Sequence, residues 1–121
     1  SVTIIDERAF SFNSLSTVII PDSVVTIGAQ AFRRSSDAAG DPLTTLTLGR
    51  SVKTIGEKAF WHNQLSRVIV PAGVITIGSN AFADNALTLV RFLSNRPTLS
   101  RSTSFSANIA RLRLDGRAIQ Y

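Results

Sequence analysis

The sequence contains no cysteine and a single histidine, His62, in 121 residues. Without cysteine, the chain has no disulfide bond, no thiol nucleophile and no thiolate ligand for a metal. With one histidine, a histidine-based metal site or a serine–histidine–aspartate triad lacks the side chains that it needs. The sequence also lacks a run of about 18 apolar residues, so we expect no insertion into a membrane.

Charged residues are scarce as well, at 17% of the chain, whereas hydrophobic residues make up 44%. A disordered chain would show the opposite balance, so this composition indicates a folded protein. The length predicts a single domain over residues 1–121.

Motifs for catalysis and for phosphate or calcium binding are absent. The sequence has no G-x-x-x-x-G-K-[ST] or G-x-G-x-x-G loop, no acidic calcium loop and no G-x-S-x-G turn. Glu7 and Glu57 share a repeat position, but each is followed by a basic residue, Arg8 or Lys58, which favours ion pairs on a solvated face. We therefore expect a protein that is not an enzyme and that has no catalytic residue, cofactor or metal site.

The formal net charge of +5 is unevenly distributed. Positive and negative residues cancel up to residue 90, and the remainder holds six arginines against a single acidic residue, Asp115. Such an asymmetry favours an acidic partner at that end. Solubility of a polar chain end explains it equally well.

A repeat of 22 residues runs along the chain. The pair Ala-Phe occurs at residues 9–10, 31–32, 59–60 and 81–82, each followed by a stretch of the form L-x-x-[VL]-x-[IVLF]. Six extra residues in the second unit lie within 35–42, a small, polar stretch with Gly40 and Pro42 that predicts a surface loop. With a weaker fifth copy, the spacing predicts about five units, over 1–21, 22–49, 50–71, 72–93 and 94–121.

Each unit has the same internal order. Alternating apolar positions such as Val18 and Ile20 predict a short strand with one buried face. Pro21 and Pro71 end such strands because proline cannot donate to a ladder. The next stretch, V-x-x-I-G, predicts a turn, and Ala-Phe predicts a helical or 3₁₀ turn whose phenylalanine fills the interior. An asparagine three residues after a phenylalanine is expected to satisfy backbone groups, at Asn13, Asn63, Asn85 and Asn108.

The pattern V-x-x-I-G-x-x-A-F-x-x-N-x-L-x-x-V-x-[IV]-P resembles the BspA-like class of leucine-rich repeats. Its clearest copies run from Val2 to Pro21 and from Val52 to Pro71, and the resemblance covers nearly the whole chain. The resemblance implies a β-rich leucine-rich repeat solenoid, with short parallel strands on the concave face and turns or short helical segments opposite. It also implies an adhesin-like protein, extracellular or at a cell surface. The family often has cysteine where this chain has asparagine, which is the main departure.

The outward positions of the predicted strands form two columns on the concave face. Strands in a sheet lie about 4.7–4.9 Å apart, so members of one column are close neighbours. The residues expected to bind a partner are Thr17, Thr45, Arg67, Leu89 and Arg111 in the first column and Ile19, Thr47, Ile69, Arg91 and Arg113 in the second. The spacing predicts a cluster of Arg91, Arg111 and Arg113, which is suited to carboxylate, sulfate or phosphate. A solvated face is an equally good interpretation.

A second candidate surface follows the Ala-Phe pairs. Phe12, Trp61 and His62 stand at positions that vary between units, so the coil itself does not require them. Tryptophan is enriched at binding hot spots, and Trp61 with Phe12 would form a small apolar spot. The alternative, which we favour, is that these side chains cover a neighbouring coil.

Three functions are compatible with these features. The first, which we favour, is a non-enzymatic module that binds a protein through the concave face, in adhesion at a cell surface. The second is polyanion binding, to a sulfated glycan or cell-wall polymer, through the C-terminal arginines; nucleic acid is the weaker version because no aromatic platform lies beside them. The third is a structural or assembly unit, in which the uncapped N-terminal coil mediates self-association.

Overall fold

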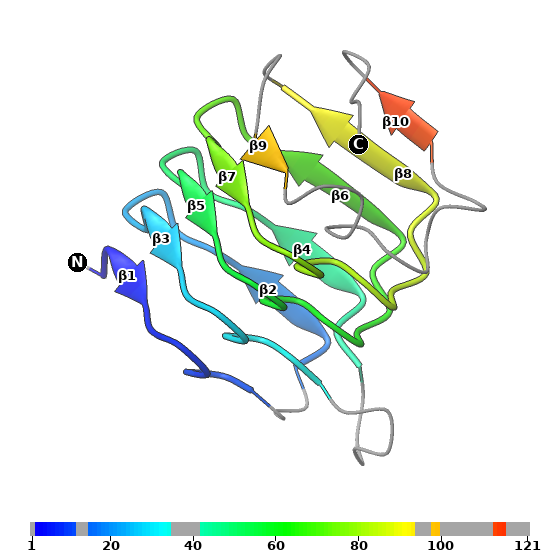
Figure 1. The fold of residues 1–121 in the computed structure, drawn as a ribbon, viewed down its shortest axis with the longest axis horizontal. Helices are drawn as coiled ribbons and strands as arrows, with labels where there is room; N and C mark the ends of the chain where they lie inside the picture. The colour runs from blue at the N-terminus through cyan, green and yellow to red at the C-terminus, as the bar shows by residue number, and fades with distance from the viewer. Residues whose placement is uncertain (1, 12–14, 35–41, 94–97, 100–112, 116–121) are drawn as a thin grey trace.

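The computed structural model describes residues 2–11, 15–34, 42–93, 98–99 and 113–115. The chain winds as a stack of coils, with odd-numbered strands along one side and even-numbered strands along the other (Figure 1). The first set of strands is β1 (Ile4–Ile5), β3 (Thr26–Ile27), β5 (Thr54–Ile55), β7 (Thr76–Ile77) and β9 (Thr98–Leu99). The second set is β2 (Thr17–Ile19), β4 (Thr45–Thr47), β6 (Arg67–Val70), β8 (Leu89–Phe92) and β10 (Arg113–Asp115).

All the strand pairs are parallel, as expected for a solenoid. The odd strands form one five-stranded sheet in the order β1-β3-β5-β7-β9. The even strands form two separate ladders, β2-β4 and β10-β8-β6. The predicted solenoid with short parallel strands is therefore confirmed, and its even-numbered side is interrupted between β4 and β6.

The odd-numbered strands correct one prediction. The V-x-x-I-G stretches were expected to be turns, yet their Thr-Ile pairs form the three central strands of the five-stranded sheet, in which Thr26 pairs with Thr54 and Thr54 with Thr76. Each of these strands is only two residues long, so it shows no alternation in the sequence. The isoleucine of each pair is buried, which anchors this wall of the coil to the core.

The Ala-Phe segments also differ from their prediction. They lie in hydrogen-bonded turns, and no helix or 3₁₀ segment occurs among the described residues. The turns are made by residues in the left-handed region two positions before each phenylalanine, with φ between 56° and 59°, at Arg8, Gln30, Lys58 and Asn80. A single left-handed residue redirects the chain where a helical turn would continue it.

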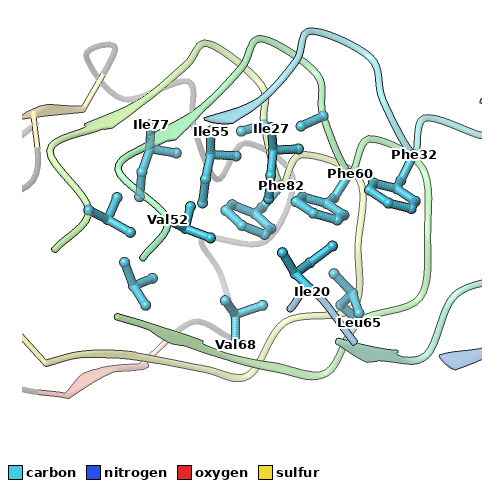
Figure 2. Close-up of a cluster of buried hydrophobic side chains, with 14 of the residues drawn as sticks. Ile20, Ile27, Phe32, Val52, Ile55, Phe60, Leu65, Val68, Ile77 and Phe82 are labelled. Atoms are coloured by element: carbon cyan, nitrogen blue, oxygen red, sulfur yellow. The ribbon is translucent and has the colours of Figure 1, made fainter. Parts of the chain in front are cut away.

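The phenylalanines of successive coils form one continuous column in the core (Figure 2). Phe10, Phe32, Phe60 and Phe82 stack with ring centroids 5.1, 5.3 and 5.3 Å apart and with planes inclined by 3–9°. Parallel columns of isoleucine, such as Ile27, Ile55 and Ile77 in Figure 2, line the other side of the interior. Each coil thus adds one residue of each kind to a shared core.

Glycine allows the coils to approach this closely. A Cβ atom on Gly56 would lie 2.6 Å from the backbone nitrogen of Ala29 in the preceding coil, well inside van der Waals contact. Gly28 and Gly78 occupy the same place in their coils and meet the same obstacle. Each of these glycines therefore stands where a side chain would clash with the backbone of the neighbouring coil.

We predict that Phe60→Ala lowers the free energy of unfolding by about 3–5 kcal/mol, because it removes a fully buried ring from the middle of the column. Phe10→Ala is the matched control, since Phe10 ends the described column and is 43% exposed. Urea denaturation followed by circular dichroism measures both. Equal losses for the two variants would contradict the idea that the column carries the stability.

We predict that Gly56→Ala lowers the free energy of unfolding by about 1–3 kcal/mol, because the added methyl group must displace the Ala29 backbone. Gly73→Ala should change stability by no more than about 0.5 kcal/mol, since its nearest neighbour would be the Arg50 carbonyl oxygen at 3.6 Å. Thermal unfolding of the two variants under the same conditions measures both changes in stability. A neutral Gly56→Ala would refute close approach as the reason for glycine.

Candidate functional site

The outward side chains of the even-numbered strands form a surface that we call the strand face: Thr17, Ile19, Thr45, Thr47, Arg67, Ile69, Leu89 and Arg91. Leu89 is half-buried and the other seven are exposed. Strand alternation produces this arrangement, because the intervening residues, such as Val18, Val68 and Val90, point into the core. Ile19 and Ile69 are 70% and 53% exposed, so two large apolar side chains stand in solvent among hydroxyl groups and arginines.

The strand register partly matches the predicted columns. Thr17 pairs with Thr45 and Ile19 with Thr47, while Arg67 pairs with Leu89 and Ile69 with Arg91. Within each ladder, the outward residues that pair with one another therefore belong to the same predicted column.

The pairing of β10 with β8 does not match the predicted columns. Arg113 pairs with Leu89, and Asp115 pairs with Arg91. The prediction that Arg113 stands beside Arg91 is therefore wrong, because the last strand is set two residues later than the 22-residue spacing places it. Arg111 lies outside the described residues. An acidic residue, Asp115, takes the strand position next to Arg91, and this weakens the expected arginine cluster.

The interruption of the strand face forms a groove of about 540 Å³ between β4 and β6. Leu46, Leu48, Ile69, Pro71 and Leu93 contribute its apolar lining, and Arg67 contributes a cation. Leu46 and Leu48 are only partly buried, unlike the equivalent Val18 and Ile20 of the first coil, because no neighbouring strand covers them.

The rim of the groove carries an ion pair. Arg50 lies with its Nε atom 3.6 Å from Asp22 Oδ2, and its backbone N–H donates to Asp22 Oδ1 at 3.0 Å. Among the groove residues, only Thr45, Thr47, Arg67 and Ile69 were predicted as part of a site. The replacement of the strand-ending proline by Gly49 in the second unit was the available sequence signal.

The edge candidates Trp61 and His62 pack against neighbouring coils. Trp61 Nε1 donates to Asp84 Oδ2 at 2.9 Å, and the Arg33 guanidinium lies 5.0 Å from the tryptophan ring centroid. His62 Nε2 lies 3.8 Å from the same Asp84 oxygen. Both side chains are half-buried. Trp61 contacts the coils on either side of its own, whereas His62 contacts the following coil through Asp84. Phe12, the third edge candidate, lies outside the described residues, as do residues 35–41 of the predicted loop.

The recurring asparagines bind the backbone, as predicted, at the two positions that the structure describes. Asn63 Nδ2 donates to the carbonyl groups of Phe32 (2.9 Å) and Phe60 (3.2 Å), and its Oδ1 accepts from the Leu43 N–H at 3.2 Å. Asn85 repeats the pattern one coil later, with its Oδ1 accepting from the Leu65 N–H at 3.0 Å. These side chains are fully occupied in holding coils together.

Groups of catalytic or metal-binding type are not assembled in the part of the chain that the structure describes. No three histidine, cysteine or acidic side chains lie together there. Nor does any helix within those ranges have the length and apolar character needed to cross a membrane. The strand face and its groove are the arrangement with the clearest capacity for recognition, through apolar contact, hydroxyl groups and arginine.

Comparison with protein families matches residues 1–112 to the BspA type leucine rich repeat region, in six copies, where the Ala-Phe spacing suggests about five units. Among solved structures, a leucine-rich repeat protein from Bacteroides capillosus is similar, with a TM-score of 0.59 and 23% sequence identity. The match covers 95% of this chain and 64% of that one, and it shows the shared fold. A search of curated proteins found no match.

We predict that Asn63→Ala lowers the free energy of unfolding by about 2–4 kcal/mol, because it removes the bonds from Asn63 to the buried Leu43 N–H and to the Phe32 carbonyl, whereas the Phe60 carbonyl keeps its bond from Asn85. The adjacent, exposed Gln64→Ala is the control and should cost less than about 0.5 kcal/mol. Chemical denaturation measures the difference. If Asn63→Ala and Gln64→Ala lowered the free energy of unfolding equally, the hydrogen bonds of Asn63 would not contribute to stability.

Proposed function

Because the chain belongs to the BspA-type leucine-rich repeat family, we propose that it is a protein-binding module that acts in adhesion at a cell surface. The strand face holds the partner. The coils of a repeat protein contact only their neighbours, and the stack presents an extended, rigid surface that suits a macromolecular ligand. The role at a cell surface rests on the family resemblance.

The exposed isoleucines of the strand face carry this proposal. Ile19 and Ile69 point away from the core, so the fold does not need an apolar residue at either position. Exposed apolar groups that gather on one face are characteristic of interaction surfaces. Arg67 and Arg91 on the same strands add the side chain that binds carboxylates with two hydrogen bonds and that is enriched at hot spots.

Polyanion binding is the second candidate, supported by the net charge of +5 and by the exposed Arg67 and Arg91. It would bring a sulfated or phosphorylated polymer to the same face, and its affinity would fall steeply with salt. The position of Asp115 opposite Arg91 weighs against it. The same position weighs further against nucleic acid, which also has no aromatic stacking platform on the strand face.

We predict that the labelled chain binds at least one member of an arrayed set of secreted proteins and cell-surface ectodomains in a saturable manner. Ile69→Asp should weaken this binding at least tenfold, because it places a charge within the apolar part of the strand face. Ile75→Asp is the matched control, since Ile75 is 57% exposed and precedes β7 on the other sheet. Surface plasmon resonance gives both affinities.

The outcomes separate the candidate functions. Saturable binding that survives 0.5 M salt and is lost only in Ile69→Asp supports a protein partner on the strand face. Retention on heparin that is lost in Arg67→Ser and disappears in high salt would replace this proposal with polyanion binding. Equal loss in the two isoleucine variants would refute the strand face as the site.

A further inference from the structure

The groove between β4 and β6 is closed at the end where the two strands begin. There the Gln64 N–H donates to the Leu43 carbonyl at 2.9 Å, and Asn63 Oδ1 accepts from the Leu43 N–H at 3.2 Å. Among the described residues, no backbone hydrogen bond joins the two strands beyond this point. The strands remain neighbours, but no ladder closes the surface between them, and the side chains on either side line a depression.

The lining of the groove changes from polar to apolar along the strands. Because β4 and β6 run in the same direction, their first residues lie at one end of the groove and their last residues at the other (Figure 1). Thr45, Ser66 and Arg67 line the first end. Toward the other end the lining is mostly apolar, at Leu46, Leu48, Ile69, Pro71 and Leu93. One end therefore offers hydrogen-bond donors, and the other offers apolar surface.

The polar end carries donors that the described part of the chain leaves unused. The guanidinium group of Arg67 and the hydroxyl groups of Thr45 and Ser66 form no hydrogen bond or ion pair with a described residue. Arg50, the other cation of the lining, is paired with Asp22. A guanidinium binds a carboxylate through two parallel hydrogen bonds, and a neighbouring hydroxyl adds another. This end of the groove therefore suits one carboxylate group.

The apolar end leaves large side chains uncovered. Leu46 and Leu48 occupy inward positions of their coil but are only partly buried, while Ile69 and Leu93 are 53% and 54% exposed. A bound apolar group would remove this surface from water, so binding strengthens with each methylene group that it buries. The volume of about 540 Å³ lies in the range of small-molecule sites, which are mostly apolar with a few placed polar groups.

The length of the groove limits the length of its ligand. The stretch from Thr44 to Leu48 spans about 13 Å at about 3.3 Å per residue. An extended hydrocarbon chain of about ten carbons has this length. Asp22 stands at the rim with Arg50, after the end of β2, so a second anionic group at that end would be repelled. The groove therefore fits a ligand with one anionic head and one apolar tail.

We propose that this groove binds an aliphatic carboxylate of medium chain length. The carboxylate pairs with Arg67 and accepts hydrogen bonds from the hydroxyl groups of Thr45 and Ser66, and the hydrocarbon tail lies against Ile69 and Leu93. The tail occupies the space between outer side chains, so the two strands do not move apart. This inference goes beyond the proposed protein-binding function and does not depend on it.

Titration of the chain with decanoate, followed by NMR, tests the proposal. We expect saturable binding of one decanoate per chain, below the concentration at which it forms micelles. Octanoate should bind about three- to tenfold more weakly, because it buries two fewer methylene groups. Decyltrimethylammonium, which has a ten-carbon tail and the opposite charge, should bind at least tenfold more weakly. Absence of decanoate binding, or equal binding of the two ten-carbon ligands, would overturn the proposal.

Matched variants test the two ends of the ligand. Arg67→Gln should weaken decanoate binding at least fivefold, whereas Lys53→Gln, which removes the same charge from an exposed position outside the groove, should leave it within twofold. Leu93→Ser should weaken binding at least threefold, and Ile75→Ser, at similar exposure beside the other sheet, should leave it within twofold. Circular dichroism checks that each variant is folded. Equal losses within either pair would show unspecific attraction and would refute the site.

The NMR spectra also locate the ligand. Decanoate should shift the amide signals of Thr45, Arg67 and Ile69 most, and its terminal methyl group should show nuclear Overhauser contacts with Leu48 or Leu93. Shifts that are largest on the odd-numbered strands would overturn the assignment to the groove. Binding to phosphatidylcholine vesicles that contain decanoate, without binding of free decanoate, would assign the groove to a lipid surface and would also overturn it.

The outcomes remain distinct from those of the proposed function. A chain that binds a protein partner through the strand face but not decanoate would overturn this inference and leave the protein-binding function intact. Saturable decanoate binding that depends on Arg67 and Leu93, in a chain that binds no protein of the arrayed set, would support the groove and count against the protein-binding function.

Discussion

The spacing between coils is the constraint on which the rest of the structure depends. Parallel strands set a distance of about 4.7–4.9 Å between neighbouring chains, and the rings of the phenylalanine column repeat at 5.1–5.3 Å, which matches that distance closely. Aromatic rings stacked nearly parallel at this distance are in contact from one coil to the next. A bulkier backbone position would push the coils apart, and Gly28, Gly56 and Gly78 prevent it.

The asparagines meet the other demand of a narrow solenoid, which is to satisfy polar backbone groups where the chain turns. Asn63 and Asn85 each bond an N–H of the coil before, and they bond carbonyl groups both in that coil and in their own. A buried amide that uses both its oxygen and its nitrogen in this way replaces the bonds that a helix would have made. In the described part of the chain, asparagine side chains therefore hold turns between the odd-numbered and even-numbered strands, and no helix is present there.

Much of this framework could be predicted from the sequence, because the repeat makes each position visible several times. The even-numbered strands, the buried phenylalanines and the structural asparagines follow from local pattern alone. The sheet of Thr-Ile pairs was missed because a two-residue strand has no period to detect. The position of Arg113 opposite Leu89 was missed because the last copy is weak, so the spacing of the other units was carried into a coil that does not follow it.

The candidate site was less predictable, for a physical reason. Ile19, Arg67, Ile69 and Arg91 are exposed on the strand face, as alternation requires. The groove depends on the absence of strand pairing between β4 and β6, which no repeating pattern in the sequence reveals. The surroundings of Trp61 likewise involve Arg33 and Asp84, which lie in different coils and share no local pattern with it.

The interruption between β4 and β6 also has a mechanical consequence. In a one-dimensional stack, cooperativity passes only through interfaces between adjacent units, so the weakest interface limits how far unfolding or strain is transmitted. The interface between the second and third coils is tied on its odd-numbered side by β3 and β5 and by the Phe32–Phe60 contact, while its even-numbered side has no ladder. In place of a ladder, the even-numbered side has the bonds of Asn63 to the Leu43 N–H and the Phe32 carbonyl, and the bond from the Gln64 N–H to the Leu43 carbonyl. Coupling between the second and third coils on that side therefore depends on the turn that Asn63 holds.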